Sequence, residues 1–233
     1  MGVNMDTIVQ TPTNNIKESL DFYSKLGFKI VSDQSPTLLS DGKALIEINP
    51  DRFARAGIKL RNASWKETAG KLEKIIPVIK TESGYLLSDP NGVWVYLEEA
   101  THLPDFDLSH ILPSVLGNFA GISLETISIE PSMEIWQLLG FSKSMGSVEQ
   151  GWLALTNKDS MTVSLMKPLS CPHLFFNPSL TYFNGENNLA IIEKVRQLKI
   201  PITEEITYFN DKGIVDNIII RDPGGYGFFI FND

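Results

Sequence analysis

An isolated carboxylate, Glu47, is the residue of this sequence whose type and setting best suit chemistry. It lies among apolar neighbours in the strand-like segment 44–48. If that strand faces a cavity opposite Tyr96, loss of hydration raises the pKa of the carboxyl and suits it to general-base catalysis. The alternative is a carboxylate that only accepts hydrogen bonds, and we favour that interpretation.

A charged loop follows Glu47 at the expected mouth of the same cavity. Arg52 and Arg55 are spaced to clamp a carboxylate or phosphate, although a solvated or ion-paired loop explains the same residues. Aromatic rings and an amide elsewhere offer stacking and a polar contact for a flat ligand. The predicted ligand-binding residues are Gln10, Glu47, Arg52, Arg55, Trp94 and Tyr96.

The histidines and the single cysteine are weaker candidates. Cys171 and His173 place a thiol and an imidazole two residues apart, a spacing at which a thiolate can be activated as a nucleophile. A buried, inert cysteine in an apolar loop explains this pair as well, and we favour it. His102 and His110 lie in a proline-containing stretch and are expected to be solvated loop residues.

The elements that must position these residues recur along the chain. A strand at 5–11 is followed by a helix whose apolar stripe ends before Gly27, and then by three short strands. The same β-α-β-β-β order returns three times, which predicts an α+β fold with two units in each half. The expected organisation is a first domain at 1–100, a connector at 101–117 and a second domain at 118–233.

An Asp-Pro turn precedes the last predicted strand of each half. Asp89-Pro90-Asn91-Gly92 and Asp222-Pro223-Gly224-Gly225 are typical of tight turns in which the aspartate side chain accepts hydrogen bonds from the backbone. A strand is expected directly after each.

Composition excludes several classes of partner. The net charge of −8 provides no basic field for a nucleic acid. No run approaches the ~18 apolar residues of a membrane span, and one cysteine permits no internal disulfide. We therefore expect a cytoplasmic protein.

The segments 19–28 (SLDFYSKLGF) and 135–141 (IWQLLGF), together with the two Asp-Pro turns, resemble the vicinal oxygen chelate superfamily. That family includes glyoxalases, extradiol dioxygenases and bleomycin-resistance proteins. The resemblance implies tandem pairs of βαβββ modules whose curved mixed sheets enclose a cavity, and metal-dependent members hold the ion with four side chains.

The same resemblance allows each ligand position to be checked. In the first half the positions fall near Ile8, at Glu47, near Gly57 and at Tyr96; in the second they fall near Gly121, at Ser164, near Ser179 and at Phe229. Only Glu47 is a ligand of the usual kind, and catalytic metal sites need about three protein ligands. We expect neither a metal nor another cofactor.

The resulting prediction is a metal-independent protein, monomeric or homodimeric, that binds a small, partly apolar molecule in its first half. In the second half, Trp152, Phe229 and Phe231 form an aromatic wall that fills a core or lines a pocket. Two alternatives stay open. One is a lyase, isomerase or dioxygenase-like enzyme that uses Glu47 or an unrecognised metal site, and the other is an interaction module with collapsed pockets.

Overall fold

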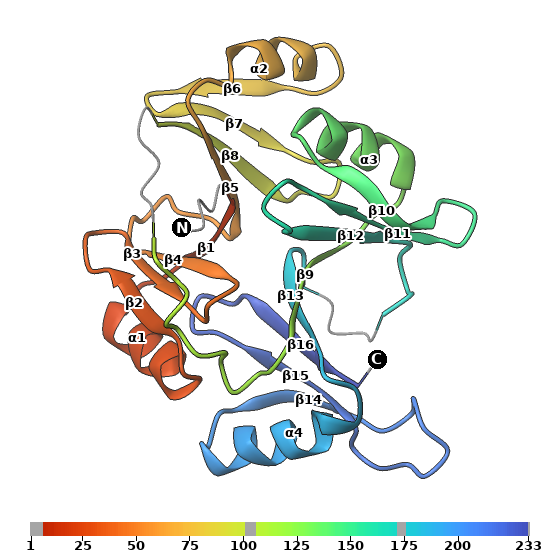
Figure 1. The fold of residues 1–233 in the computed structure, drawn as a ribbon. Coiled ribbons are helices and arrows are strands. Elements are labelled where there is room, and N and C mark those ends of the chain that lie inside the picture. Colours follow the sequence, from red (N-terminus) through yellow and green to blue (C-terminus); the bar gives the residue numbers. More distant parts are fainter. Residues whose placement is uncertain (1–6, 101–105, 172–175, 233) are drawn as a thin grey trace.

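The chain folds into two mixed sheets of eight strands with helices on their outer sides (Figure 1). The structure is a computed structural model and describes residues 7–100, 106–171 and 176–232. All the strands up to Glu99 belong to the first sheet, and all the strands from Phe119 onwards belong to the second.

The first half has two helices within its described residues, 7–100. Its elements are β1 (Thr7–Pro12), α1 (Ile16–Lys25), β2 (Lys29–Ser32), β3 (Thr37–Ser40), β4 (Leu45–Asn49), β5 (Gly57–Asn62), α2 (Lys66–Leu72), β6 (Val78–Thr81), β7 (Gly84–Ser88) and β8 (Trp94–Glu99). The strand order across the sheet is β2-β3-β4-β1-β5-β8-β7-β6.

The second half repeats this plan and adds one short 3-10 turn. Its elements are β9 (Phe119–Glu125), α3 (Ile129–Leu138), β10 (Ser142–Ser147), β11 (Trp152–Thr156), β12 (Thr162–Met166), β13 (Ser179–Phe183), η1 (Gly185–Asn187), α4 (Asn188–Gln197), β14 (Ile202–Ile206), β15 (Asn217–Arg221) and β16 (Gly227–Phe231). The order β10-β11-β12-β9-β13-β16-β15-β14 matches that of the first sheet.

Each sheet has an approximate two-fold arrangement about its two central strands. β1 and β5 run antiparallel with Val9 opposite Ile58, while β1 pairs in parallel with β4 and β5 pairs in parallel with β8. In the second sheet Ile122 opposite Leu180 marks the same point. The tandem α+β fold of paired βαβββ modules is therefore confirmed.

Local signals explain most helix ends. The Asn15 side chain accepts a hydrogen bond from the Glu18 backbone N–H (3.3 Å) and starts α1, and Gly27 ends it with a φ of 93°. Ser64 and Glu67 have the spacing of a capping box at the start of α2, but no such pair of bonds forms between them. Instead the Glu99 carboxylate of β8 accepts from the Trp65 backbone N–H at 2.8 Å.

Both Asp-Pro turns form as expected. The Asp89 carboxylate accepts from the backbone N–H groups of Asn91 and Val93, and the Asp222 carboxylate accepts from that of Tyr226. Each turn also contacts the opposite half. The Asn91 amide donates to the Ser132 hydroxyl of α3 (3.1 Å), whereas Asp222 accepts from Thr11 (2.7 Å) and Tyr23 (2.9 Å).

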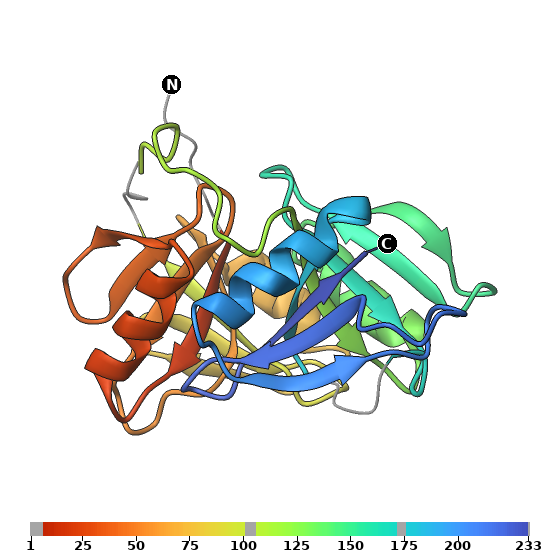
Figure 2. The ribbon, with the colours of Figure 1, turned by 90° about the horizontal axis from the view of Figure 1, so that it is seen from below.

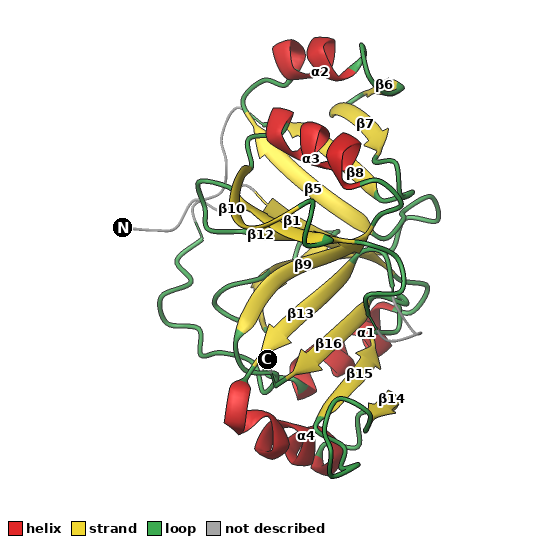
Figure 3. Ribbon diagram, turned by 90° about the vertical axis from the view of Figure 1, so that its right-hand side faces the viewer, coloured by secondary structure: helices red, strands yellow, loops and turns green. Residues whose placement is uncertain are grey.

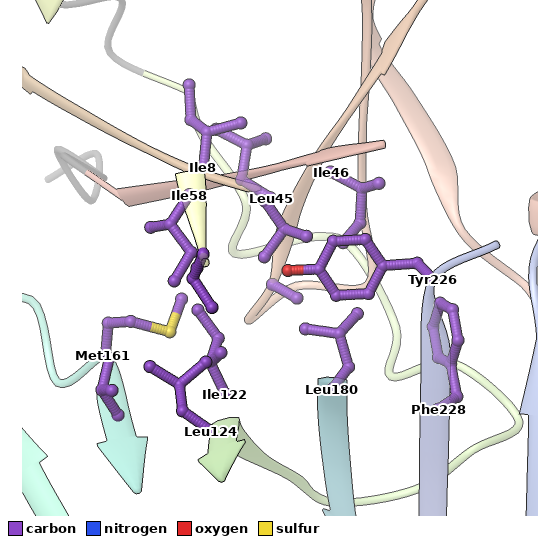
Figure 4. Packing of buried hydrophobic residues seen from close by; sticks show 14 of the residues in the cluster. Ile8, Leu45, Ile46, Ile58, Ile122, Leu124, Met161, Leu180, Tyr226 and Phe228 are labelled. Carbon is purple, nitrogen blue, oxygen red and sulfur yellow. The ribbon is translucent and has the colours of Figure 1, made fainter. Parts of the chain in front are cut away.

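The two halves share one apolar core. Figures 1 and 3 place α2 beside α3 at one end of the molecule, and α1 and α4 at the other end. Figure 2 views this second end, with α4 (blue) in front and α1 (orange-red) next to it. Lys25 of the first half and Lys199 and Arg221 of the second line a common groove there. Between the ends, Ile46 and Ile58 meet Leu180 and Phe228 across the contact between the sheets (Figure 4).

Candidate functional site

Strand register places four side chains together on one face of the first sheet. Gln10 lies opposite Glu47, and Lys59 lies opposite Tyr96. Gln10 and Ile8 point to the same side because side chains alternate along a strand, and Ile8 is the partner of Lys59. All four side chains therefore share a face. We call Gln10, Glu47, Lys59 and Tyr96 the first-half quartet.

The quartet corrects two of the ligand positions inferred from the sequence. Gln10 and Lys59 are equivalent by the two-fold relation through Val9 and Ile58, and they, rather than Ile8 and Gly57, lie opposite Glu47 and Tyr96. Gly57 has a different role, because a Cβ there would lie 2.4 Å from the Trp94 carbonyl oxygen. Lys59 was missed as a site residue. Its signal was a single lysine among the apolar residues of the segment 57–60.

An ion pair occupies the centre of the quartet. The Lys59 Nζ lies 2.9 and 2.8 Å from the two carboxylate oxygens of Glu47, and both side chains are buried. The same ammonium lies 3.6 Å from Glu98, which also pairs with Arg61. Two cations thus balance two carboxylates. Glu47 is therefore a compensated ion-pair partner and not an isolated carboxylate in an apolar cavity.

Tyr96 presents a polar group beside this ion pair. Burial raises the pKa of the phenol above its ordinary value, although hydrogen bonds with the Gln10 side chain and the Arg55 backbone act in the opposite direction. A phenol with a raised pKa stays protonated at neutral pH. As a protonated phenol, Tyr96 can donate a hydrogen bond to a ligand.

A pocket of about 550 Å³ opens beside Gln10 and Tyr96. The Asn49 amide connects its wall to the ion pair, since its Nδ2 lies 3.1 Å from the Gln10 Oε1 and 3.4 Å from a Glu47 oxygen. The rest of the lining combines small polar groups with two prolines and an aromatic ring. The lining residues are Gln10, Ser35, Pro36, Asn49, Pro50, Asp51, Phe53, Ala54 and Tyr96.

The other predicted ligand-binding residues lie near the pocket without converging on it. The Arg52 guanidinium stacks on the Phe53 ring, 4.5 Å from its centroid. The exposed Arg55 side chain donates to the Ala54 carbonyl, while the Arg55 carbonyl accepts from Gln10 at 2.9 Å. Trp94 is half-buried and is not among the lining residues. The structure thus brings Gln10 and Tyr96 together at the pocket and leaves the arginine clamp unformed.

The corresponding face of the second half is filled by its own side chains. Its equivalent quartet is Ser123, Ser164, Thr181 and Phe229, so Gly121 and Ser179 are not the matching positions. The Ser123 and Thr181 hydroxyls bond each other at 2.8 Å. Phe229 stacks on Phe231 within a separate apolar cluster, completed by Ile206, Ile219, Cys171 and Phe176.

The predicted aromatic wall of the second half therefore forms only in part. Phe229 and Phe231 are buried, whereas Trp152 has 41% of its surface exposed. Phe176 lies so close to Gly227 that a Cβ there would be 2.2 Å from the ring. This face holds packed aromatic rings where the first half holds a polar pocket.

Comparison with known proteins finds similarity only among solved structures. No protein-family model and no curated protein matches the sequence. The 2,3-dioxygenase LapB from Pseudomonas sp. KL28 is 15% identical, with a TM-score of 0.58 over 98% of this chain and 92% of that chain. Homoprotocatechuate 2,3-dioxygenase from Arthrobacter globiformis is 13% identical, with a TM-score of 0.60 over 96% and 78%. A catechol 2,3-dioxygenase is 16% identical, with a TM-score of 0.56 over 98% and 87%.

The chain has the tandem fold of the extradiol dioxygenases. The sequence resemblance to the vicinal oxygen chelate superfamily is thereby confirmed at the level of the fold. The extradiol dioxygenase fold extends over both halves, because each match covers nearly the whole of this chain.

The residues on this dioxygenase fold do not fit a resident divalent metal. The first-half quartet supplies one carboxylate, one amide, one phenol and one ammonium, and an ammonium repels a cation. Across residues 7–100, 106–171 and 176–232, no group of three or more His, Cys, Asp or Glu side chains is placed to hold a metal ion. Three protein ligands are the usual minimum for a catalytic site.

The cysteine and histidine candidates do not form a second site. The Cys171 Sγ lies 3.0 Å from the Met166 sulfur, and burial raises the pKa of the thiol to about 12, which disfavours a nucleophilic thiolate. His110 is an exposed loop residue, as expected, 3.9 Å from Asp107. His102 and His173 lie outside the described residues.

No helix in the described part of the chain is long and apolar enough to cross a membrane.

Proposed function

We propose that this protein binds a small, partly apolar molecule in the first-half pocket without using a metal. The observation that carries this proposal is the Tyr96 hydroxyl. Tyr96 lines the pocket, and its phenol keeps its proton at neutral pH and can therefore donate a hydrogen bond to a ligand. A few placed polar groups in an otherwise apolar pocket are the usual basis of small-molecule specificity.

The pocket chemistry limits the class of ligand. The Tyr96 O–H suits a hydrogen-bond acceptor on the ligand, whereas Pro36, Pro50 and Phe53 suit an apolar, planar body. The buried charges behind the wall cancel one another, so they do not call for a charged ligand. The similar structures include enzymes named for catechol and homoprotocatechuate, which makes oxygen-bearing aromatic compounds the first class to test.

Binding is favoured over catalysis because the quartet lacks a free base. Both oxygens of Glu47 are engaged by Lys59. An enzyme that used Glu47 as a base would have to break this buried pair first. The opposite idea, an interaction module with two collapsed pockets, is not supported in the first half, where the pocket is open.

A thermal-shift screen of phenols and aromatic carbonyl compounds, beginning with catechol, tests this function. For the compound that stabilises the protein most, Tyr96→Phe should raise the Kd about 5- to 10-fold, since one hydrogen bond contributes about 1–1.5 kcal/mol. Tyr208→Phe removes an exposed hydroxyl in the second half and should leave the Kd unchanged. Ser164→Ala and Ser179→Ala should also have no effect.

Two outcomes contradict the proposal. One is equal affinity in the wild type and Tyr96→Phe. The other is hydrogen-exchange protection that maps to Trp152 and Phe229 when the ligand binds. Glu47→Ala is a poorer test, because it leaves the buried Lys59 ammonium without its main partner. It is expected to lower the free energy of unfolding by several kcal/mol.

A further inference from the structure

The first-half quartet holds a cation even though its residues do not suit a metal. The Lys59 Nζ contacts both oxygens of Glu47 and approaches Glu98 to 3.6 Å, so two carboxylates from different strands face one positive charge. Lys59 is equivalent to Gln10 and projects from the same face of the sheet. We propose that the Lys59 ammonium replaces the divalent cation of this fold family, so that the first half keeps its architecture without a metal.

The charge arrangement explains why a cation is needed at this point. Glu47 is 1% exposed, and a buried carboxylate without a compensating charge is strongly unfavourable. Arg61 pairs with Glu98, and no ion pair within the described residues joins Arg61 to Glu47. Lys59 is thus the cation that compensates Glu47, and an ammonium tethered through the backbone cannot dissociate or be removed by a chelator.

In the second half, uncharged residues occupy the positions equivalent to Glu47 and Lys59. There the equivalents of Glu47 and Lys59 are Ser164 and Thr181, and the hydroxyl of Thr181 bonds Ser123. Neither a carboxylate nor a cation is found at these positions. Carboxylate and ammonium therefore occur together in the first half and are both missing from the second-half quartet, as expected if one exists to balance the other.

The replacement predicts that Lys59 excludes divalent ions from the site. Lys59→His removes the ammonium and supplies an imidazole beside Glu47 and Glu98, a donor set that suits Ni²⁺ and Zn²⁺. Isothermal titration with Ni²⁺ alone should detect 1:1 binding to this variant at least about ten-fold tighter than any binding to the wild type. Ni²⁺ should also raise the variant's melting temperature, since a ligand specific for the native state stabilises it.

Three controls separate this effect from a new surface histidine. Lys80→His places an imidazole on an exposed strand position and should gain no 1:1 site. Lys59→His combined with Glu47→Gln should lose the Ni²⁺-dependent rise in melting temperature. Lys59→Met removes the cation and adds no strong donor for Ni²⁺, so it should be less stable than the wild type and bind Ni²⁺ more weakly than Lys59→His.

Two results overturn the inference. The first is a wild-type protein that binds Ni²⁺ or Zn²⁺ stoichiometrically in a manner abolished by Glu47→Gln. The second is a Lys59→His variant whose folding and melting temperature show no response to Ni²⁺. If that variant is unfolded when metal-free, recovery of its near-ultraviolet circular dichroism on Ni²⁺ addition is the readout, and absence of recovery counts against the proposal. None of these measurements depends on the ligand of the neighbouring pocket.

Discussion

Two tyrosine hydroxyls at the contact between the halves have opposite surroundings. The Tyr23 hydroxyl donates to Asp222 at 2.9 Å. The Tyr226 side chain is just as buried, yet its hydroxyl finds no hydrogen-bond partner within the described residues. Figure 4 shows its oxygen pointing into the apolar core, towards Leu45. A buried donor without a partner reduces the free energy of unfolding.

Tyr226→Phe should therefore stabilise the protein by about 1 kcal/mol, because it removes an unsatisfied hydroxyl and keeps the ring. Tyr23→Phe is the matched control and should destabilise the protein by about 1–2 kcal/mol, since it takes a donor away from the buried Asp222. Urea unfolding at neutral pH gives both values. A loss of stability in Tyr226→Phe would show that a water or a rearranged acceptor satisfies the hydroxyl.

Asp222, which accepts the hydrogen bond from Tyr23, makes the stability of the protein depend on pH. Burial raises the pKa of Asp222 above its ordinary value, although bonds from Thr11, Tyr226 and Tyr23 oppose the shift. The native state then binds the proton more tightly than the unfolded state does. The contribution of Asp222 to stability is complete below its unfolded pKa and is lost as the pH rises through the folded pKa.

The stability of the wild type relative to Asp222→Asn should consequently fall as the pH rises above the unfolded pKa of about 3.9 and through the higher folded pKa, by about 1.4 kcal/mol for each unit by which the folded pKa exceeds the unfolded pKa. Urea unfolding at a series of pH values measures this difference. Asp211→Asn, which neutralises an exposed carboxyl, controls for the altered net charge. A difference that grows with pH would mean that the hydrogen bonds outweigh the burial.

At the scale of elements, local signals were sufficient to predict what each segment becomes. Alternating strands, the apolar stripe of α1 and the cap at Gly27 are all encoded within a few neighbouring residues. The capping box at Ser64 failed because Glu99, 35 positions away, binds the start of α2 instead. The ligand positions near Ile8 and Gly57 were missed for the same kind of reason, since the registers of β1 on β4 and of β5 on β8 place Gln10 and Lys59 opposite Glu47 and Tyr96.

Two glycines in neighbouring elements should respond oppositely to the same substitution. Gly57→Ala in β5 places a Cβ 2.4 Å from the Trp94 carbonyl oxygen, so it should destabilise the protein by about 1–3 kcal/mol. Gly70→Ala in α2 meets no atom within 4 Å and should stabilise it by about 0.5–1 kcal/mol through helix propensity. Thermal unfolding of the two variants compares them directly, and a Gly57→Ala protein as stable as the wild type would contradict the close approach of β5 and β8.

For the whole molecule, one core and a set of reciprocal polar contacts join the halves. Asn91 of the first half bonds Ser132, Tyr182 of the second half bonds Asp41 at 3.1 Å, and Asp222 accepts from the first half. Because these groups are buried or partly buried, separating the halves exposes apolar surface and leaves polar partners unmatched. The halves should not behave as independent folding units.

Urea unfolding is therefore expected to be a single transition. The four tryptophans are divided equally, with Trp65 and Trp94 in the first half and Trp136 and Trp152 in the second. Single-tryptophan variants of each half should report the same midpoint, and Tyr23→Phe should lower both midpoints together. Two separated midpoints, or a shift confined to the first half, would be inconsistent with a shared core.

The contacts of each Asp-Pro turn with the opposite half also restrict how the sequence can diverge. Tyr23 and Asp222 are 199 positions apart in the chain and nevertheless share one hydrogen bond. A lineage that loses the phenol keeps a buried carboxyl with one donor fewer, so we expect a compensating change at position 222. Shuffling one half against that of a distant relative would separate the partners at every such contact. The two halves must therefore be inherited as a matched pair, even though each repeats the plan of the other.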